Sequence, residues 1–354
     1  MDIQIISETL LTVIFGTIAL ASFGIVFGLL YKGLDRKLSA HMQGRIGPPI
    51  RQPFRDVAKL FSKENIVPEN AITWIFNLAP LAGLIATITI LLYLPIGGFP
   101  PLLSNSGDLI LILYLLIIPS LALVVGGFSS GSPYATVGAQ REMVAMMAYE
   151  FPLAIIIISI AWKLTTVLGE ANVFAFSTIS TTPIWNNAGP LGLIGFLILL
   201  LVLILVTPGE LSKIPFDAPE AETEIAGGLL VEYSGRNLAM FYLTDGVKTI
   251  AMASIIVAIF FPYNLSPFFG IANSYLGYSI DIIFYLVKVF IVILFSVTLI
   301  RVAVARLKID QFVYTYWVPL LLIGLIGLIC VLYDTWTLNE WGWPTVVEIL
   351  GLPK

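Results

Sequence analysis

Long runs of apolar residues alternate with shorter polar segments along most of the chain. A helix needs about 20 such residues to cross a bilayer, and in lipid it satisfies its own backbone hydrogen bonds. A membrane β-barrel would instead show short segments of alternating polarity. The pattern therefore predicts an all-α integral membrane protein with a single polytopic domain over residues 1–354. Eight transmembrane helices are expected, at about 9–31, 72–96, 108–127, 143–162, 190–208, 238–262, 282–303 and 313–333.

The composition agrees with a membrane protein that binds no metal or cofactor itself. Of its 354 residues, 58% are hydrophobic and 11% are charged, whereas a soluble domain carries about 25% charged residues. Cys330 is the single cysteine and His41 the single histidine. An iron–sulfur cluster or a structural zinc site generally needs about four such ligands. If the protein takes part in redox chemistry, partner subunits are expected to carry the electrons.

Basic residues gather in alternate loops, which predicts the orientation. Loop 32–71 holds eight of the 18 lysines and arginines, while the second, fourth and sixth loops hold only Lys163. By the positive-inside rule the odd-numbered loops are cytoplasmic and both termini lie outside. The first and fifth loops, both cytoplasmic, are long. The remaining basic residues of the odd loops are Arg141, Lys213, Arg236, Arg301, Arg306 and Lys308.

The first cytoplasmic loop contains a possible short amphipathic helix at 54–61. Phe54, Val57 and Leu60 form a mainly apolar side, and Arg55 and Lys59 are polar. Two interpretations stay open, a helix lying in the lipid head-group layer and a docking surface for a soluble partner protein.

The fifth loop concentrates carboxylates at the mouth of the membrane domain. Glu220 and Glu224 could share one face of a short helix at i, i+4. Clustered carboxylates raise one another's pKa and can exchange protons near neutral pH. The alternative is a solvated acidic surface, or salt bridges to the basic first loop. The acidic residues of the fifth loop are Asp217, Glu220, Glu222, Glu224 and Glu232.

Two glutamates belong to the predicted fourth span. A charge inside a span costs about 2.5–3.5 kcal/mol on insertion scales, so it needs a partner or a hydrated cavity. Glu142 opens this span and has two simple explanations, pairing with Arg141 or interaction with the helix start. Glu150 lies two turns further on, where Pro152 weakens the local helix. Glu150 is therefore the stronger candidate to line a hydrated path.

Asp245 and Lys248 lie three residues apart in the sixth span and could pair directly. Such a pair could hold helices together or could belong to an ion pathway. The chain has no phosphate-binding loop, dinucleotide motif or nucleophile elbow. Its basic residues have no interleaved stacking aromatics, so nucleic acid is not an expected partner.

Several of these motifs together resemble one family. The run SKIPFDAPEAETE at 212–224 followed by VEYSG at 231–235 resembles the signature of a membrane component of respiratory complex I, the one called the H subunit in bacteria and ND-one in mitochondria. The segments DRK at 35–37, QGRIGP at 43–48 and DVAKLF at 56–61 resemble the first cytoplasmic loop of that family. The resemblance covers nearly the whole chain and implies a core membrane subunit, without a catalytic centre of its own, of an oxidoreductase complex.

Other segments resemble one branch of that family. GSPYATVGAQRE at 131–142 and ARLKID at 305–310 look like the homologous subunits of energy-converting membrane-bound [NiFe] hydrogenases, and Asp35 stands where the family often has Glu. The resemblance implies peripheral hydrogenase-like large and small subunits, an iron–sulfur subunit and antiporter-like membrane subunits as partners. Iron–sulfur clusters and a NiFe centre would lie in those partners. Scarce Gln, Cys and His with abundant Ile favour a thermophile, so the expected location is the plasma membrane of a thermophilic archaeon.

The resemblance also assigns roles to residues. The carboxylates would couple electron transfer to H⁺ or Na⁺ translocation, and the basic first loop would face the peripheral subunits. The same role in a sulfane-sulfur- or quinone-reducing relative is an alternative, and a stand-alone ion-coupled transporter or a pure membrane anchor is an alternative of another class. The ion-pathway candidates are Glu142, Glu150, Asp217, Glu220, Glu222, Glu224, Glu232, Asp245 and Lys248. The interface candidates are Arg36, Lys37, Arg45, Arg51 and Arg55.

Overall fold

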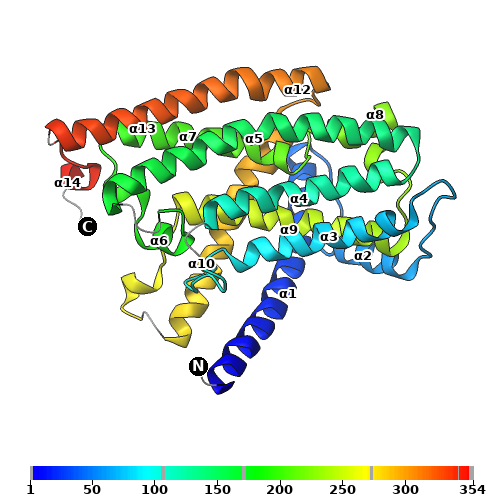
Figure 1. The fold of residues 1–354 in the computed structure, drawn as a ribbon, viewed down its shortest axis with the longest axis horizontal. Helices are drawn as coiled ribbons and strands as arrows, with labels where there is room; N and C mark the ends of the chain where they lie inside the picture. Colours follow the sequence, from blue (N-terminus) through cyan, green and yellow to red (C-terminus); the bar gives the residue numbers. More distant parts are fainter. Residues whose placement is uncertain (1–2, 105–107, 170–172, 272–273, 342, 351–354) are drawn as a thin grey trace.

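The computed structural model describes residues 3–104, 108–169, 173–271, 274–341 and 343–350. Eight helical segments in these ranges are long and apolar enough to cross a membrane, as predicted. Figure 1 shows most of them running side by side. Their helices are α1 (Ile3–Met42), α3 (Thr73–Leu92), α4 (Asp108–Ser129), α5 (Pro133–Leu168), α7 (Pro190–Glu210), α9 (Gly235–Phe260), α10 (Tyr275–Ile293) with α11 (Leu299–Ala303), and α12 (Ile309–Thr315) with α13 (Leu321–Trp341).

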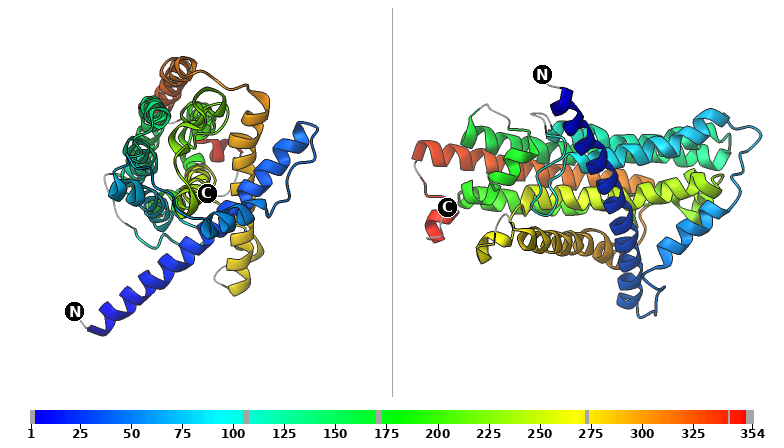
Figure 2. Two further views of the ribbon diagram at one scale, coloured as in Figure 1. Left: turned by 90° about the vertical axis from the view of Figure 1, so that its right-hand side faces the viewer. Right: turned by 90° about the horizontal axis from the view of Figure 1, so that it is seen from below.

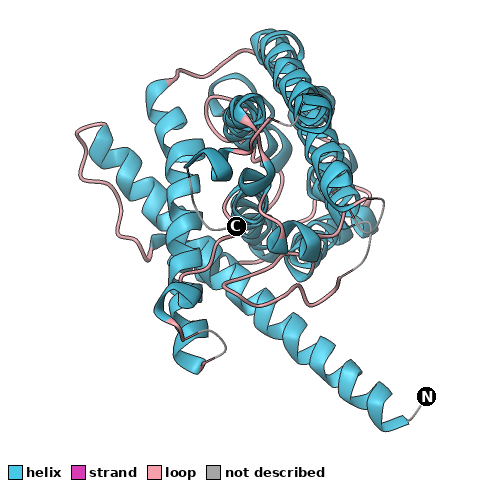
Figure 3. Cartoon of the chain, turned by 90° about the vertical axis from the view of Figure 1, so that its left-hand side faces the viewer, coloured by secondary structure: helices cyan, strands magenta, loops and turns pink. Residues whose placement is uncertain are grey.

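Shorter helices lie in the connections. In the described ranges every named element is a helix (Figure 3), apart from an isolated bridge between Ile96 and Phe99. The all-α prediction is therefore confirmed. The short helices are α2 (Gln52–Ser62), α6 (Phe176–Thr181), η1 (Ile184–Asn187), η2 (Ala218–Glu220), α8 (Glu222–Ile225), η3 (Gly228–Leu230), η4 (Ser266–Phe269) and α14 (Val346–Leu350).

Two helices extend well beyond their predicted bounds. α1 continues to Met42 and takes in the first part of the predicted loop 32–71. α5 begins at Pro133 rather than near 143, because proline at the first helical position is already set in a helical φ. Glu142 therefore lies nine residues inside α5 and does not open the span, so its predicted interaction with a helix start is wrong.

α9 forms the centre of the bundle and is almost wholly buried. α1, α3, α7 and α10 all contact it, and Figure 2 shows α1 crossing the other helices steeply, with its N-terminal part projecting beyond them. A Cβ on Gly28 would lie 2.7 Å from the Gly246 carbonyl carbon, so only glycine permits this approach of α1 to α9. The crossing brings the polar residues of α1 beside those of α9.

A π-helical turn at 294–298 joins α10 to α11. Such turns often mark functional places in a helix. Here the turn directs the Thr298 hydroxyl to Asp35 at 2.8 Å, and Arg301 reaches the same carboxylate at 2.9 Å. Asp35 of α1 is thereby fixed to the seventh membrane segment.

The amphipathic helix predicted at 54–61 is confirmed as α2. Its apolar side packs Val57 against Leu29 of α1 and Leu243 of α9, while Arg55 and Lys59 are exposed. Whether this helix contacts lipid or a soluble partner stays a prediction.

Candidate functional site

The acidic fifth loop folds back over the N-terminal part of α5. A Cβ on Gly138 of α5 would lie 2.8 Å from the Leu229 nitrogen and 3.0 Å from the Pro219 oxygen. The loop backbone therefore rests directly on the backbone of α5. Just after α7, Ser212 adopts φ +48°, a left-handed conformation that is uncommon for residues other than glycine. Strained backbone of this kind clusters at functional sites.

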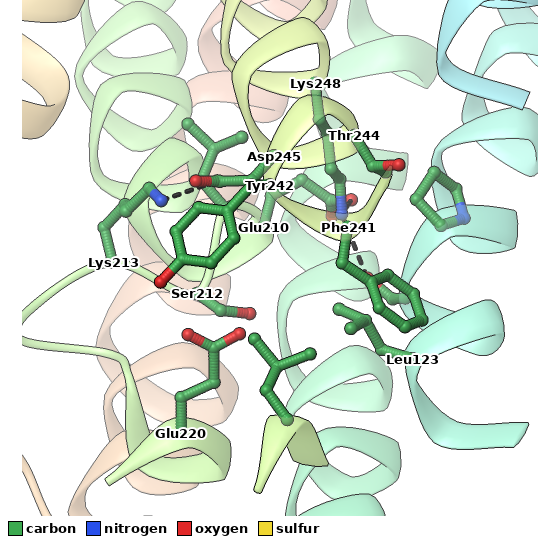
Figure 4. Close-up of a pocket in the computed structure, with 14 residues that line it drawn as sticks. Leu123, Glu210, Ser212, Lys213, Glu220, Phe241, Tyr242, Thr244, Asp245 and Lys248 are labelled. Carbon is green, nitrogen blue, oxygen red and sulfur yellow. Dashed lines mark hydrogen bonds and ion pairs between the residues drawn. The ribbon is translucent and has the colours of Figure 1, made fainter. Parts of the chain in front are cut away.

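Beneath this loop lies a cavity of about 100 Å³, which we call the acidic chamber. Its walls come from α4, the end of α7, the acidic loop and α9, and Figure 4 shows their polar side chains directed toward one another. The polar residues that line the chamber are Ser120, Glu210, Ser212, Lys213, Glu220, Tyr242, Thr244, Asp245 and Lys248.

Asp245 is held between two lysines. Lys213 of the loop lies 2.5 Å from one oxygen of its carboxylate, and Lys32 of α1 lies 2.6 Å from the other. Lys32 reaches Asp245 because α1 crosses α9 one residue away, at Gly246. Burial alone would lower the pKa of Lys213, but the Asp245 carboxylate outweighs that effect and raises it.

Lys248 turns to a different carboxylate, so the predicted direct pair of Asp245 and Lys248 is wrong. The Lys248 Nζ lies 2.8 Å from Glu210 Oε1 and donates to the Ser120 hydroxyl at 2.9 Å. Ser120 in turn shares a hydrogen bond of 3.1 Å with the Tyr149 hydroxyl of α5. These contacts connect three membrane helices and the end of α7 through polar groups.

Glu142 lies behind the chamber wall and is almost fully buried. One of its oxygens accepts a long hydrogen bond of 3.4 Å from Ser212, and the other has no hydrogen-bond partner among the described residues. The predicted pairing with Arg141 is wrong, because Arg141 points away to Glu224 at 2.6 Å. A buried, incompletely satisfied carboxylate beside a polar cavity is costly in its charged form and is a natural proton acceptor.

Glu220 enters the chamber from the loop. Burial, together with repulsion from Asp245 and Glu142, raises its pKa to about 7, against the opposing attraction of Lys213. A carboxyl with such a pKa can gain or lose a proton near neutral pH. Glu220 is the group at this site best placed to exchange a proton with the cytoplasmic side predicted above.

The other loop carboxylates lie outside the chamber. Glu220 and Glu224 do not share a helix face, because Ala221 has extended ψ and separates η2 from α8. Asp217 accepts two hydrogen bonds from Arg306, which raise the pKa of the guanidinium. The alternative of salt bridges to the first loop is also wrong, since the partners are Arg141 of α5 and Arg306 between α11 and α12. Glu222 is exposed, and Glu232 is half-buried away from the chamber lining.

Glu150 does not line the chamber, although its charge and that of Glu142 both act on Glu210. It is half-buried on α5, which continues without a break through Pro152. Sequence reasoning missed Glu210, because this residue ends an apolar run and resembles the ordinary edge of a span. The signal that could have identified Glu210 was its charge at the end of a membrane span, which is costly without a partner.

The basic candidates for the partner interface lie on α1, α2 and the turn between them. Arg36 forms an ion pair of 3.3 Å with Asp56, and Lys37 is half-buried. The three exposed members are Arg45, Arg51 and Arg55.

Comparison with known proteins identifies the family. A sequence profile described as NADH dehydrogenase matches residues 15–332. The chain belongs to this family. It is a homologue of the H subunit of complex I, and members of the family are membrane subunits of complex I-like oxidoreductase complexes.

Named relatives span several complexes. The chain is 30% identical over 333 residues to the H subunit of F(420)H(2) dehydrogenase from Methanosarcina mazei, covering 88% of this chain and 91% of that one. It is 30% identical over 296 residues to an H subunit of NADH-quinone oxidoreductase from Koribacter versatilis, covering 80% of this chain and 66% of the relative. Among solved structures, a chain of the archaeal membrane-bound sulfane sulfur reductase is 28% identical with a TM-score of 0.76, covering 90% of this chain and 99% of the other. The family that was inferred from the motifs is thereby confirmed.

Proposed function

We propose that this chain couples electron transfer in a docked redox arm to H⁺ or Na⁺ translocation through the acidic chamber. The observation that carries the proposal is the acidic chamber, where Glu220 shares a cavity with Glu210, Asp245 and two lysines. Burial there raises the pKa of Glu220 to about 7. Ser212 connects this cavity to the incompletely paired Glu142. Family membership supports a subunit role and disfavours a stand-alone transporter.

The physical route is electrostatic. A charge or conformational change above the acidic loop would alter the balance between Glu220 and Lys213. Each pKa unit corresponds to about 1.4 kcal/mol, so a modest change in the loop would move a proton onto or off a carboxylate. Glu142 and Glu210 would pass the charge change into the membrane, toward Glu150. In this role the chain binds no cofactor, and iron–sulfur clusters with a NiFe centre would belong to the partners.

The exposed bases of α2 and the preceding turn support a place for those partners. A hydrogenase-like large subunit, a small subunit and an iron–sulfur subunit would dock on Arg45, Arg51 and Arg55, with Arg36 and Lys37 at the edge. Antiporter-like subunits would extend the path within the plasma membrane. The archaeal relatives and the composition favour a thermophilic archaeon as the source.

Within this proposal the first candidate reaction is hydrogen evolution, on the resemblance of residues 131–142 and 305–310. Sulfane sulfur reduction is the second, because the structural match to the sulfane sulfur reductase covers nearly all of both chains. Affinity purification of the native tagged protein, followed by assays with a reduced ferredoxin-like donor, separates the two. We expect a multisubunit assembly that evolves hydrogen. Sulfide production without hydrogen would select the second candidate, and purification of the chain alone would contradict the subunit role.

A further inference from the structure

A second polar pocket of about 270 Å³ lies at the opposite end of α9 from the acidic chamber. Val257 and Ala258 of α9 line it, thirteen residues beyond Asp245, which corresponds to roughly 20 Å along a helix. By the predicted orientation this end of α9 faces the outer side of the membrane. The polar residues that line the pocket are Ser180, Thr181, Asn264, Tyr285 and Lys288.

Lys288 is the charged group of this pocket. Its Nζ donates to the backbone oxygens of Phe261 and Tyr263 at 2.8 and 2.7 Å. An ammonium has three N–H groups, so one donor remains after these two bonds. The Nζ also lies 4.9 Å from the centroid of the Phe284 ring. No carboxylate in the described ranges forms an ion pair with it, in contrast to Lys163 and Lys248. A lysine in a membrane helix without an acidic partner is costly and points to a ligand or a functional role.

Asp281 is the nearest acid on the same helix, and it has other partners. Its carboxylate accepts from the Leu265 nitrogen at 3.0 Å, the Ser266 nitrogen at 2.8 Å and the Ser266 hydroxyl at 2.6 Å. These three donors satisfy Asp281 within the loop that follows α9. Its charge still attracts Lys288, but it does not occupy the ammonium directly.

The remaining polar groups match a ligand that carries both anionic acceptor atoms and hydroxyl donors. The Asn264 amide supplies N–H donors near the Lys288 charge, which suits an anion. The Ser180 and Thr181 hydroxyls donate to backbone oxygens of α6, so their lone pairs remain for hydroxyl donors from a ligand. A phosphodiester that carries a hydroxylated group satisfies both requirements.

Aromatic side chains place this pocket in the lipid head-group layer. Phe268 is 83% exposed and Tyr275 is 94% exposed. Phe99 at the pocket wall stacks on Tyr278, with the two ring centroids 4.7 Å apart. Exposed aromatic rings of this kind gather at membrane–water interfaces. The anion in such a place would come from the membrane.

We propose that this pocket binds the phosphodiester head group of an anionic lipid of the outer leaflet. Lys288 and Asn264 hold the phosphate, and Ser180 and Thr181 accept hydrogen bonds from the head-group hydroxyls. The acyl chains lie along the exposed rings of Phe99, Phe268 and Tyr275. The lipid would help to fix α6, the loop after α9 and α10 to one another on the side away from the acidic chamber.

The test is lipid retention by the purified complex. We expect native mass spectrometry to show retained phosphatidylglycerol in preference to phosphatidylcholine, and Lys288→Gln to weaken phosphatidylglycerol binding roughly tenfold. Lys288→Arg should retain most of the binding, and Lys63→Gln, at an exposed lysine near α2, should change nothing. If Lys288→Gln fails to assemble, Asn264→Ala decides with the same readout.

Added inorganic phosphate separates a lipid from a free anion. Retention that is unchanged by millimolar phosphate supports a lipid site. Displacement by phosphate, or equal retention of phosphatidylglycerol in wild type and Lys288→Gln, would overturn the proposal.

Discussion

Replacing Lys163 with methionine is expected to destabilise the protein by about 3–5 kcal/mol. The Lys163 Nζ lies 2.7 Å from Asp334 Oδ2, and both side chains are almost completely buried, at 2% and 1% exposure. Asp334 also accepts from the Gly189 nitrogen at 3.0 Å, and its other oxygen has no hydrogen-bond partner among the described residues. Removing Lys163 would leave the buried Asp334 carboxylate with a single hydrogen-bond donor, the Gly189 nitrogen.

The geometry leaves no easy relaxation for that carboxylate. A Cβ on Gly192 would lie 2.3 Å from Asp334 Oδ2, so α7 closes directly over it. Thermal unfolding of the purified complex in detergent measures the effect. Lys163→Met with Asp334→Asn removes both charges and should recover most of the lost stability. Lys63→Met at an exposed position is the matched control. Equal melting temperatures for Lys163→Met and wild type would show that this pair does not stabilise the fold.

Ion-coupled turnover should fall as pH rises through about 7, because Glu220 has a pKa of about 7 in the folded chain. The sign follows from the proposed role, in which the protonated form of Glu220 supplies the proton to the chamber. A raised pKa also means that the folded state holds the Glu220 proton more tightly than the unfolded chain does. The contribution of Glu220 to the free energy of unfolding is therefore fully present below about pH 4.3, the pKa of a free glutamate, and is lost as pH rises through 7. At pH 8 roughly a tenth of the Glu220 side chains would still carry the proton.

Two variants assign this titration to Glu220. Glu220→Gln should remove the step near pH 7 from the turnover profile. Asp245→Asn should move it to lower pH, because the substitution removes a repelling carboxylate and frees Lys213 and Lys32 to stabilise the charged form of Glu220. A step that stays near pH 7 in Glu220→Gln would assign the titration to another group.

The fold followed from the sequence because lipid permits few solutions. The eight apolar runs each had to become a helix. The ends of helices were less predictable, since polar residues continue a helix when distant groups satisfy them. Asp35 lies in α1 beyond the predicted span and is held by Thr298 and Arg301 from the seventh membrane segment.

The candidate site was predictable in its residue types but not in its pairings. The density of carboxylates in the fifth loop pointed to Glu220, and the cost of charge in a span pointed to Lys248. The actual partners depend on tertiary contacts that spacing cannot show. Lys32 meets Asp245 because two glycines let α1 approach α9, and Glu210 meets Lys248 because α7 contacts α9.

The most direct test of the coupling role is the number of ions moved per electron in vesicles that contain the purified complex. Glu142→Gln keeps the shape of the buried side chain and removes its ability to carry a proton. We expect electron transfer to continue while the ion-to-electron ratio falls by at least about tenfold. Glu222→Gln makes the same change at an exposed loop position and should keep the wild-type ratio. A wild-type ratio in Glu142→Gln would contradict the account.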